Sequence, residues 1–388
     1  MVLPASRINR LPNQFFAALT ASALKMSVEG HDIINLGQGN PDLATPSHVV
    51  EALREAALDP SNHRYPPFRG LAELREAICG FYLREYGVTL DPDREVAVLF
   101  GGKTGLVEIS QCLLDPGDVA LVPDPGYPDY WSGVALANAS MHFMPLTASN
   151  GFLPHYEDIP EEICGRAKLM FLNYPNNPTC AVADSDFFER TVSFARQHDI
   201  VVAHDFAYGA IGFDRKPTSF LQSSGAKEVG VEFYTLSKTY NMAGWRVAFA
   251  LGNPDVIGLI NLLQDHLYVS LFGAVQKAAI AALTGDQSCV NELLNIYRRR
   301  RDGFLSVLAA GHYPTIPVPG SFFVWLPVPA GFTSSSFAEL LLQRHHVVVA
   351  PGIGFGQAGD GYVRVAMLES EERLNLAARR IVLAASRR

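Results

Sequence analysis

The sequence is poor in cysteine, with five in 388 residues, and none of them forms a CxxC pair. An odd number of widely scattered cysteines does not build a disulfide framework, and the missing pair spacing argues against the common zinc-binding patterns. We therefore expect reduced thiols, no metal site and a cytoplasmic location.

Long hydrophobic runs and an excess of basic residues are also missing. No stretch approaches the ~20 apolar residues of a membrane span, and the N-terminal MVLPASRINRLPNQFF lacks the apolar segment of a signal peptide. Lys and Arg number 31 against 39 Asp and Glu, for a net charge of −8. Nucleic-acid-binding surfaces are usually strongly basic, so we expect neither nucleic acid nor a membrane as a partner. We expect the arginine run at 298–301 to lie on a solvated or salt-bridged helix face.

What the chain does contain is typical of a soluble globular protein of about two domains, with 48% hydrophobic and 18% charged residues. Between residues 95 and 251, short apolar runs alternate with longer amphipathic segments. These runs are VAVLF, VALVP, AKLMFLNYP, IVVAHD, EFYTL and VAFAL. The alternation predicts an α/β fold with a largely parallel sheet, in which reactive groups gather beyond the carboxyl ends of the strands.

After residue 254 the chain becomes helical and then returns to mixed strands and helices. We interpret residues 41–284 as a large domain. Residues 1–40 and 285–388 are expected to form a smaller α+β domain, which is discontinuous because the helix predicted near residues 14–29 packs with it.

Polar residues follow the predicted strands. The turn GGKTG at 101–105 leads into a helical segment and aims free N–H groups at an anion, although a plain strand-to-helix turn explains it as well. Asp205 ends the apolar run IVVAHD, where a carboxylate needs a cationic or hydrogen-bonding partner. A pyridinium nitrogen is such a partner, and Tyr208 could reach a second atom of the same ring. Capping of the next turn is the alternative.

Lys238 follows the run EFYTL and lies between Ser237 and Thr239, with Arg246 eight residues farther on. No carboxylate is within several positions, so the lysine is placed to lose its proton, and only the neutral amine attacks an aldehyde. A surface lysine is the plainer alternative for this residue alone. The hydroxyls and the arginine suit a phosphate. In the irregular turn NYPNNPT, Asn177 presents an amide near the same rim.

In this order the motifs resemble those of the class I/II aminotransferases, which have the fold-type I architecture and depend on pyridoxal 5'-phosphate. The resemblance covers nearly the whole chain. It implies that Lys238 is the Schiff-base lysine, that Asp205 partners the pyridine nitrogen, and that Tyr208 acts with them in catalysis. The further cofactor contacts implied by the resemblance are Gly102, Lys103, Tyr127, Asn177, Tyr208, Thr235, Ser237 and Arg246. Substrate contacts are implied for Gly39, Asn177 and Arg364, the last as the clamp on the substrate carboxylate.

Two further positions bear on the resemblance. Tyr65, in HRYPPFRG, is similar to a tyrosine that the neighbouring subunit adds to the phosphate site, which implies a homodimer with shared active sites. Cys180 departs from the pattern, because most relatives carry glycine after NPT. We expect a modest backbone adjustment there.

Within the family, HDFAYGAIGFD, LSKTYNMAGWR and QDHLYVSLFGAVQ most resemble the aminotransferases of methionine salvage. This implies ping-pong transfer that converts 4-methylthio-2-oxobutanoate into methionine, often with glutamine as donor. LL-diaminopimelate aminotransferases have similar motifs, and aspartate- or alanine-type substrates are further alternatives. A pyridoxal-phosphate-dependent β-lyase and a non-catalytic ligand-binding protein of the same fold are the rival interpretations.

Several apolar or aromatic residues are candidates for a substrate side-chain pocket that would suit a thioether better than a dicarboxylate. An ordinary place in the core or in an interface is the equal alternative for them. The candidates are Gln14, Phe15, Phe16, Tyr268 and Phe272.

Overall fold

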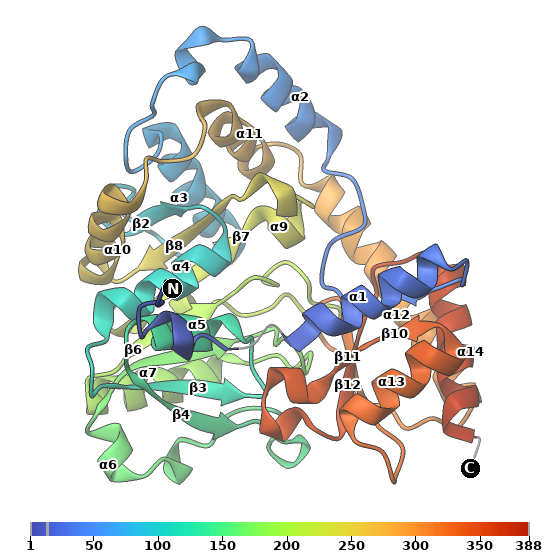
Figure 1. The fold of residues 1–388 in the computed structure, drawn as a ribbon. Helices are drawn as coiled ribbons and strands as arrows, with labels where there is room; N and C mark the ends of the chain where they lie inside the picture. Colours follow the sequence, from blue (N-terminus) through green and yellow to red (C-terminus); the bar gives the residue numbers. More distant parts are fainter. Residues whose placement is uncertain (1, 13–14, 387–388) are drawn as a thin grey trace.

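A seven-stranded sheet lies at the centre of the chain in the computed structural model, which describes residues 2–12 and 15–386 (Figure 1). Its strands are β2 (Val96–Leu99), β3 (Val119–Asp124), β4 (Ser140–Pro145), β5 (Ala167–Asn173), β6 (Val201–Asp205), β7 (Gly230–Thr235) and β8 (Ala248–Gly252). Their order across the sheet is β2-β8-β7-β6-β5-β3-β4. All neighbours pair in parallel except β8, which is antiparallel to both β2 and β7. The predicted α/β fold with a mostly parallel sheet is confirmed.

The sheet is buried on both faces, which explains the near-continuous apolar runs in its sequence. Along β2, Val96 and Val98 belong to one hydrophobic cluster, whereas Ala97 and Leu99 belong to the other. Strand β4 was not predicted. Its sequence SMHFMP mixes polar and apolar residues, and it lies partly exposed at the sheet edge.

Helices cover the sheet and extend from it. In chain order they are α2 (Ser47–Ala57), α3 (Ala72–Tyr86), α4 (Gly102–Leu113), α5 (Asp129–Leu136), α6 (Glu161–Cys164), α7 (Ser185–His198), α8 (Ala226–Val229), α9 (Leu236–Thr239), α10 (Pro254–Leu267) and α11 (Gly273–Thr284). The first turn of α4 and the short α9 begin directly beyond strand ends, so they place GGKTG and SKT at the same edge of the sheet.

Two smaller sheets lie to one side of the large one (Figure 1). One pairs β1 (Ile34–Asn35) with β10 (Val347–Val348); the other joins β11 (Ala350–Pro351), β12 (Tyr362–Ala366) and β9 (Phe323–Pro327). The helices of this region are α1 (Phe15–Val28), α12 (Ser288–Ala310), α13 (Ser334–His345) and α14 (Glu371–Ser386). Ala23 of α1 packs with Leu342 and Val348. The domain limits at residues 40 and 284 stay a prediction.

The arginine run lies on α12, and three of its four members, Arg299, Arg300 and Arg301, are ion-paired. Arg299 pairs with Glu371 at 2.9 Å, and the buried Arg300 pairs with Asp42 at 2.8 Å. All five cysteines are free thiols. Among residues 2–12 and 15–386, no helix is long and apolar enough to cross a membrane.

Candidate active site

A cavity of about 380 Å³ opens beyond the carboxyl ends of β5, β6 and β7. Every predicted site residue except Tyr65 lines it: Gly39, Gly102, Lys103, Tyr127, Asn177, Asp205, Tyr208, Thr235, Ser237, Lys238, Arg246 and Arg364. The side chain of Tyr65 is 89% exposed and lies outside this cavity. Thus the fold gathers residues from distant segments into one site.

Lys238 projects from α9 into the cavity. Thr235 caps this short helix by accepting a hydrogen bond from the N–H of Ser237. The Nζ atom of Lys238 donates to the carbonyl of Gly39 at 2.7 Å. Burial and then the nearby Arg364 guanidinium lower the pKa of Lys238 to about 8, against the opposing effect of Asp205. An appreciable fraction of the amine is therefore neutral and nucleophilic near physiological pH.

Asp205 ends β6 with its carboxylate toward the same cavity. Oδ2 accepts a hydrogen bond from the hydroxyl of Tyr130 at 2.8 Å, and Oδ1 accepts one from the N–H of Ala207 at 3.2 Å. Burial raises the pKa of Asp205, while the Tyr130 hydrogen bond acts in the opposite direction. A cation bound next to this carboxylate would stabilise its charged form.

Tyr130 and Asn173 were missed in the sequence. Tyr130 is fully buried on α5 and stacks on Phe171 at 4.7 Å, so its sequence position resembles that of any core aromatic. Asn173 donates to the carbonyl of Asp205 at 2.7 Å and accepts from the N–H of Asn177 at 2.7 Å. Asn173 thereby ties the end of β6 to the NYPNNPT turn, a link that only the parallel pairing of β5 with β6 produces.

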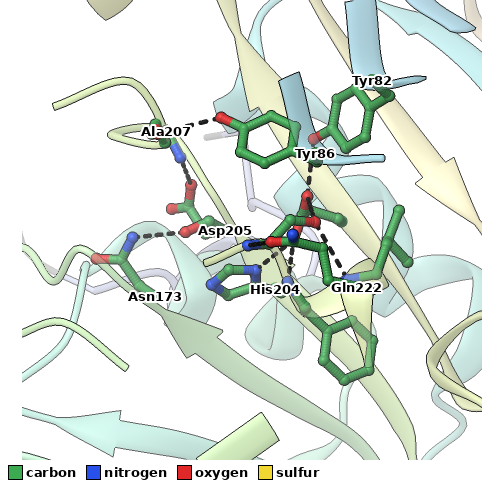
Figure 2. A network of polar contacts seen from close by, with 12 residues as sticks. Tyr82, Tyr86, Asn173, His204, Asp205, Ala207 and Gln222 are labelled. Atoms are coloured by element: carbon green, nitrogen blue, oxygen red, sulfur yellow. Dashed lines mark hydrogen bonds and ion pairs between the residues drawn. The ribbon is translucent and has the colours of Figure 1, made fainter. Parts of the chain in front are cut away.

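Neighbouring residues on β6 belong to two separate polar groups, as Figure 2 shows. Asp205 lies with Asn173 and Ala207, whereas His204 lies with Tyr82 and Gln222. Successive strand residues point to opposite faces of a sheet. The Nδ1 atom of His204 is 2.7 Å from Glu232, and both side chains are fully buried and do not line the cavity.

The N-terminus of α4 faces an arginine and two hydroxyls. Gly101 has φ +87°, and a Cβ there would lie 2.1 Å from Nη2 of Arg246, so a side chain at this position would displace the guanidinium. The hydroxyls of Thr235 and Ser237 are 2.9 Å apart beside them. N–H groups at a helix N-terminus, hydroxyls and a guanidinium together form a donor set for phosphate. The nearby Lys103 pairs with Asp129 at 3.0 Å.

Arg364 is buried at the opposite wall. Its Nη1 donates to Oδ1 of Asn177 at 2.7 Å, and its Nη2 donates to the carbonyl of Gly37 at 2.9 Å. The guanidinium packs on the rings of Phe323 and Phe355 at 4.2 and 4.6 Å. Burial lowers its pKa to about 10, so it is still charged at neutral pH. Its buried Nε has no hydrogen-bond partner among the described residues, which leaves a donor for a carboxylate ligand.

Two of the candidates for a substrate side-chain pocket, Tyr268 and Phe272, lie outside the cavity of their own chain. The Tyr268 ring packs edge-on against Phe100 at 4.7 Å, and its hydroxyl donates to Glu108. Phe272 is half-exposed. Neither residue lines the cavity of its own chain. Within one chain, both therefore fit the alternative of an ordinary core or interface residue. Gln14 and the side chains of Phe15 and Phe16 lie outside the described residues.

Cys180 is buried next to Phe323, which lines the cavity. Its φ of 67° lies in the left-handed region that favours glycine, so cysteine occupies a strained backbone position. The thiol contacts the carbonyl of Phe323 at 3.1 Å. Burial raises the pKa of Cys180 to about 12, so the thiol is neutral.

Known proteins match the chain over nearly its whole length. The family model "Aminotransferase class I and II" matches residues 31–381. The chain belongs to this family. L-glutamine--4-(methylsulfanyl)-2-oxobutanoate aminotransferase of Bacillus subtilis (strain 168) is 59% identical over 96% of this chain and 94% of its own length. LL-diaminopimelate aminotransferase of Moorella thermoacetica is 48% identical, with 97% of each chain covered. The substrate-bound BacF structure from Bacillus subtilis has a TM-score of 0.96 at 50% identity, covering 99% of this chain and 98% of its own.

Like other class I and II aminotransferases, the protein is a transaminase that depends on pyridoxal 5'-phosphate. The residues present fit this cofactor. The Gly101 turn under Arg246 offers a cradle that a Cβ would fill, and the open Nε of Arg364 can donate to an anion. The buried carboxylate of Asp205 lines the same cavity and can pair with a cationic ring nitrogen.

Proposed function

We propose that this aminotransferase converts 4-methylthio-2-oxobutanoate into methionine, with Lys238 as its catalytic amine. The observation that carries the catalytic assignment is the position of Lys238, which lies in one cavity with Asp205 and Arg364 and has a pKa lowered to about 8. The substrate assignment is supported by the relative that is 59% identical and is named for this oxo acid.

When bound, pyridoxal phosphate supplies an aldehyde that reacts with amines and a ring that accepts electrons released at the substrate Cα. Arg246, Thr235, Ser237 and the N–H groups that begin α4 would hold the phosphate. Asp205 would face the ring nitrogen. The other proposed ring contacts are Tyr127 on its face and Asn177 with Tyr208 at its hydroxyl.

Arg364 and Lys238 would have different roles toward the substrate, one in binding and the other in proton transfer. Arg364 would bind the α-carboxylate through its free Nε, which orients the Cα–H bond toward Lys238. The neutral Nζ atom of Lys238 would take the proton from Cα and return it on the cofactor side. Asp205, which accepts a hydrogen bond from Tyr130, would set its carboxylate opposite the ring nitrogen and so favour the release of electrons from Cα.

Leu106, Phe323 and Phe355 give the cavity apolar walls, which suit a thioether. LL-diaminopimelate is the second candidate, because enzymes named for it are 44–48% identical over 95–97% of the chain. Its second ammonium and carboxylate would each need a polar partner.

Half-reaction rates with a panel of amino acids test the substrate. We expect methionine and glutamine to react faster than LL-diaminopimelate, aspartate and alanine; the reverse order would reject the proposal. Keto-acid product formed without an amino acceptor would indicate β-elimination. No reaction with any member of the panel would reject both candidate substrates.

A cytoplasmic homodimer with shared active sites is part of the proposal. Tyr65 and Phe68 are exposed in the segment after α2, and the half-exposed Phe272 stacks on His63 of that segment at 6.3 Å. We expect a dimer mass in solution and weaker cofactor binding in Y65F. A monomer with full activity would contradict the shared site.

A further inference from the structure

A mixed group of metal-binding side chains lies between α6 and α7, outside the active site. One ligand atom each from Glu161, Cys164 and His198 lies within 4.8 Å of the others. Glu161 and Cys164 are three residues apart on α6, and His198 ends α7. The cysteine spacing gave no sign of this group, because the histidine comes from a distant segment.

These side chains have few competing partners. In the part of the chain that the structure describes, neither the Glu161 carboxylate nor the His198 ring nitrogens have a hydrogen-bond partner. The His198 ring packs on Phe194 at 4.7 Å. The Cys164 thiol is 3.8 Å from the carbonyl of Ile159, a weak contact. A thiol with one weak contact, an imidazole and a carboxylate thus lie close together with little competition for their ligand atoms.

The surroundings favour a cation. The three side chains line a cavity of about 650 Å³ that also exposes the carboxylates of Glu157, Asp186 and Glu189. Arg190 is the one Lys or Arg among the described lining residues. The carbonyl end of α7 adds partial negative charge beside His198. The negative charge of these carboxylates raises the local concentration of cations.

We propose that Glu161, Cys164 and His198 bind one divalent ion of the zinc type, with water as a fourth ligand. Thiolate and imidazole ligands select zinc over magnesium or calcium, which prefer oxygen. Binding replaces the thiol proton of Cys164 with the ion and releases that proton to solvent. Because a proton is released when the ion binds, affinity increases with pH.

The ion would serve the fold, not the reaction. The lining of this cavity shares no residue with the cavity that holds Lys238. In Figure 1, α6 lies at the outer edge of the molecule, away from α13 and α14. An ion bound there would fasten α6 to the end of α7 and stabilise the folded chain by mass action.

Titration of the metal-free, cofactor-loaded full chain with Co²⁺ tests the site. Tetrahedral cobalt absorbs at the red end of the visible spectrum, beyond the absorption of the cofactor, and zinc then displaces it. No amino acid is added, since amino acids chelate metals. We expect one ion per chain, and a higher melting temperature with zinc.

The variants C164S and H198Q should each bind the ion more than about tenfold more weakly, since even outer-shell changes cost 10–100-fold. C289S and H266Q are the matched controls, from α12 and α10, and should bind as the wild type does. Unchanged transaminase activity shows that each variant is folded. The proposal is overturned if one equivalent of Co²⁺ gives no red absorption, or if all four variants bind alike.

Discussion

Two buried carboxylates on neighbouring strands of the large sheet have opposite surroundings. Glu232 on β7 is saturated by donors of its own chain at 2.7–2.8 Å, which are the Tyr82 and Ser219 hydroxyls, the Phe220 N–H and the His204 ring. Asp205 on β6 accepts two hydrogen bonds and faces the cavity. Buried polar groups are normally satisfied, so unused capacity at Asp205 indicates a ligand and full saturation at Glu232 indicates a structural role.

Two buried arginines repeat the contrast. Arg300 on α12 makes a two-point pair with Asp42 and a further bond to the carbonyl of Met367. Arg364 instead keeps an unpartnered Nε among the described residues. In both pairs the group with fewer partners lines the cavity, and the group with more partners lies outside it.

Removal of the saturated acid should cause the largest change in stability. E232A leaves His204 buried without its partner, and we expect a loss of about 3–5 kcal/mol in the free energy of unfolding. The folded fraction should keep its turnover. Urea unfolding of the cofactor-loaded enzyme measures this, with the exposed Glu339 as control in E339A. Equal stability of the two variants would contradict a structural role.

Removal of the unsaturated acid should change the reaction instead. D205A is expected to lower kcat by about 10²–10³-fold, a usual cost of losing one electrostatic partner of developing charge. Turnover is measured at a cofactor occupancy fixed from absorbance. Wild-type kcat with cofactor bound would show that Asp205 does not face the ring.

The rate at which Lys238 reacts with the cofactor should depend on pH. Because its pKa is lowered to about 8, the neutral amine fraction grows as pH rises through this value. Recombination of the cofactor-free chain with pyridoxal phosphate should therefore speed up about tenfold between pH 7 and pH 9. Stopped-flow absorbance measures the rate. K103A, which alters the other cavity lysine, should keep the same midpoint, and a midpoint near the usual 10.5 would refute the lowered pKa.

The smallest expected effect concerns the hydroxyl that orients Asp205. Y130F removes one hydrogen bond worth about 0.5–1.5 kcal/mol, so we expect a fall in kcat of about tenfold or less. The substrate KM should hardly move, because Tyr130 does not line the cavity. A changed KM with unchanged kcat would argue against this positioning role.

Much of the site could be predicted because strand-end motifs are local. GGKTG, Asp205 and the Lys238 segment each follow an apolar run, and the parallel sheet brings such ends together. Partners that depend on packing were missed. Tyr130 looks like a core aromatic, and His198 joins α6 only through the fold. The edge strand β4 was missed because its sequence lacks a buried apolar run.

The central claim is that Lys238, and not Lys103, holds the cofactor. Borohydride reduction of the loaded enzyme fixes the pyridoxyl group to the amine that carries it, and peptide mass spectrometry then locates it. We predict one label per chain, on the peptide that contains Lys238, and none in K238A. A label on the Lys103 peptide, or a label that persists in K238A, would contradict this account.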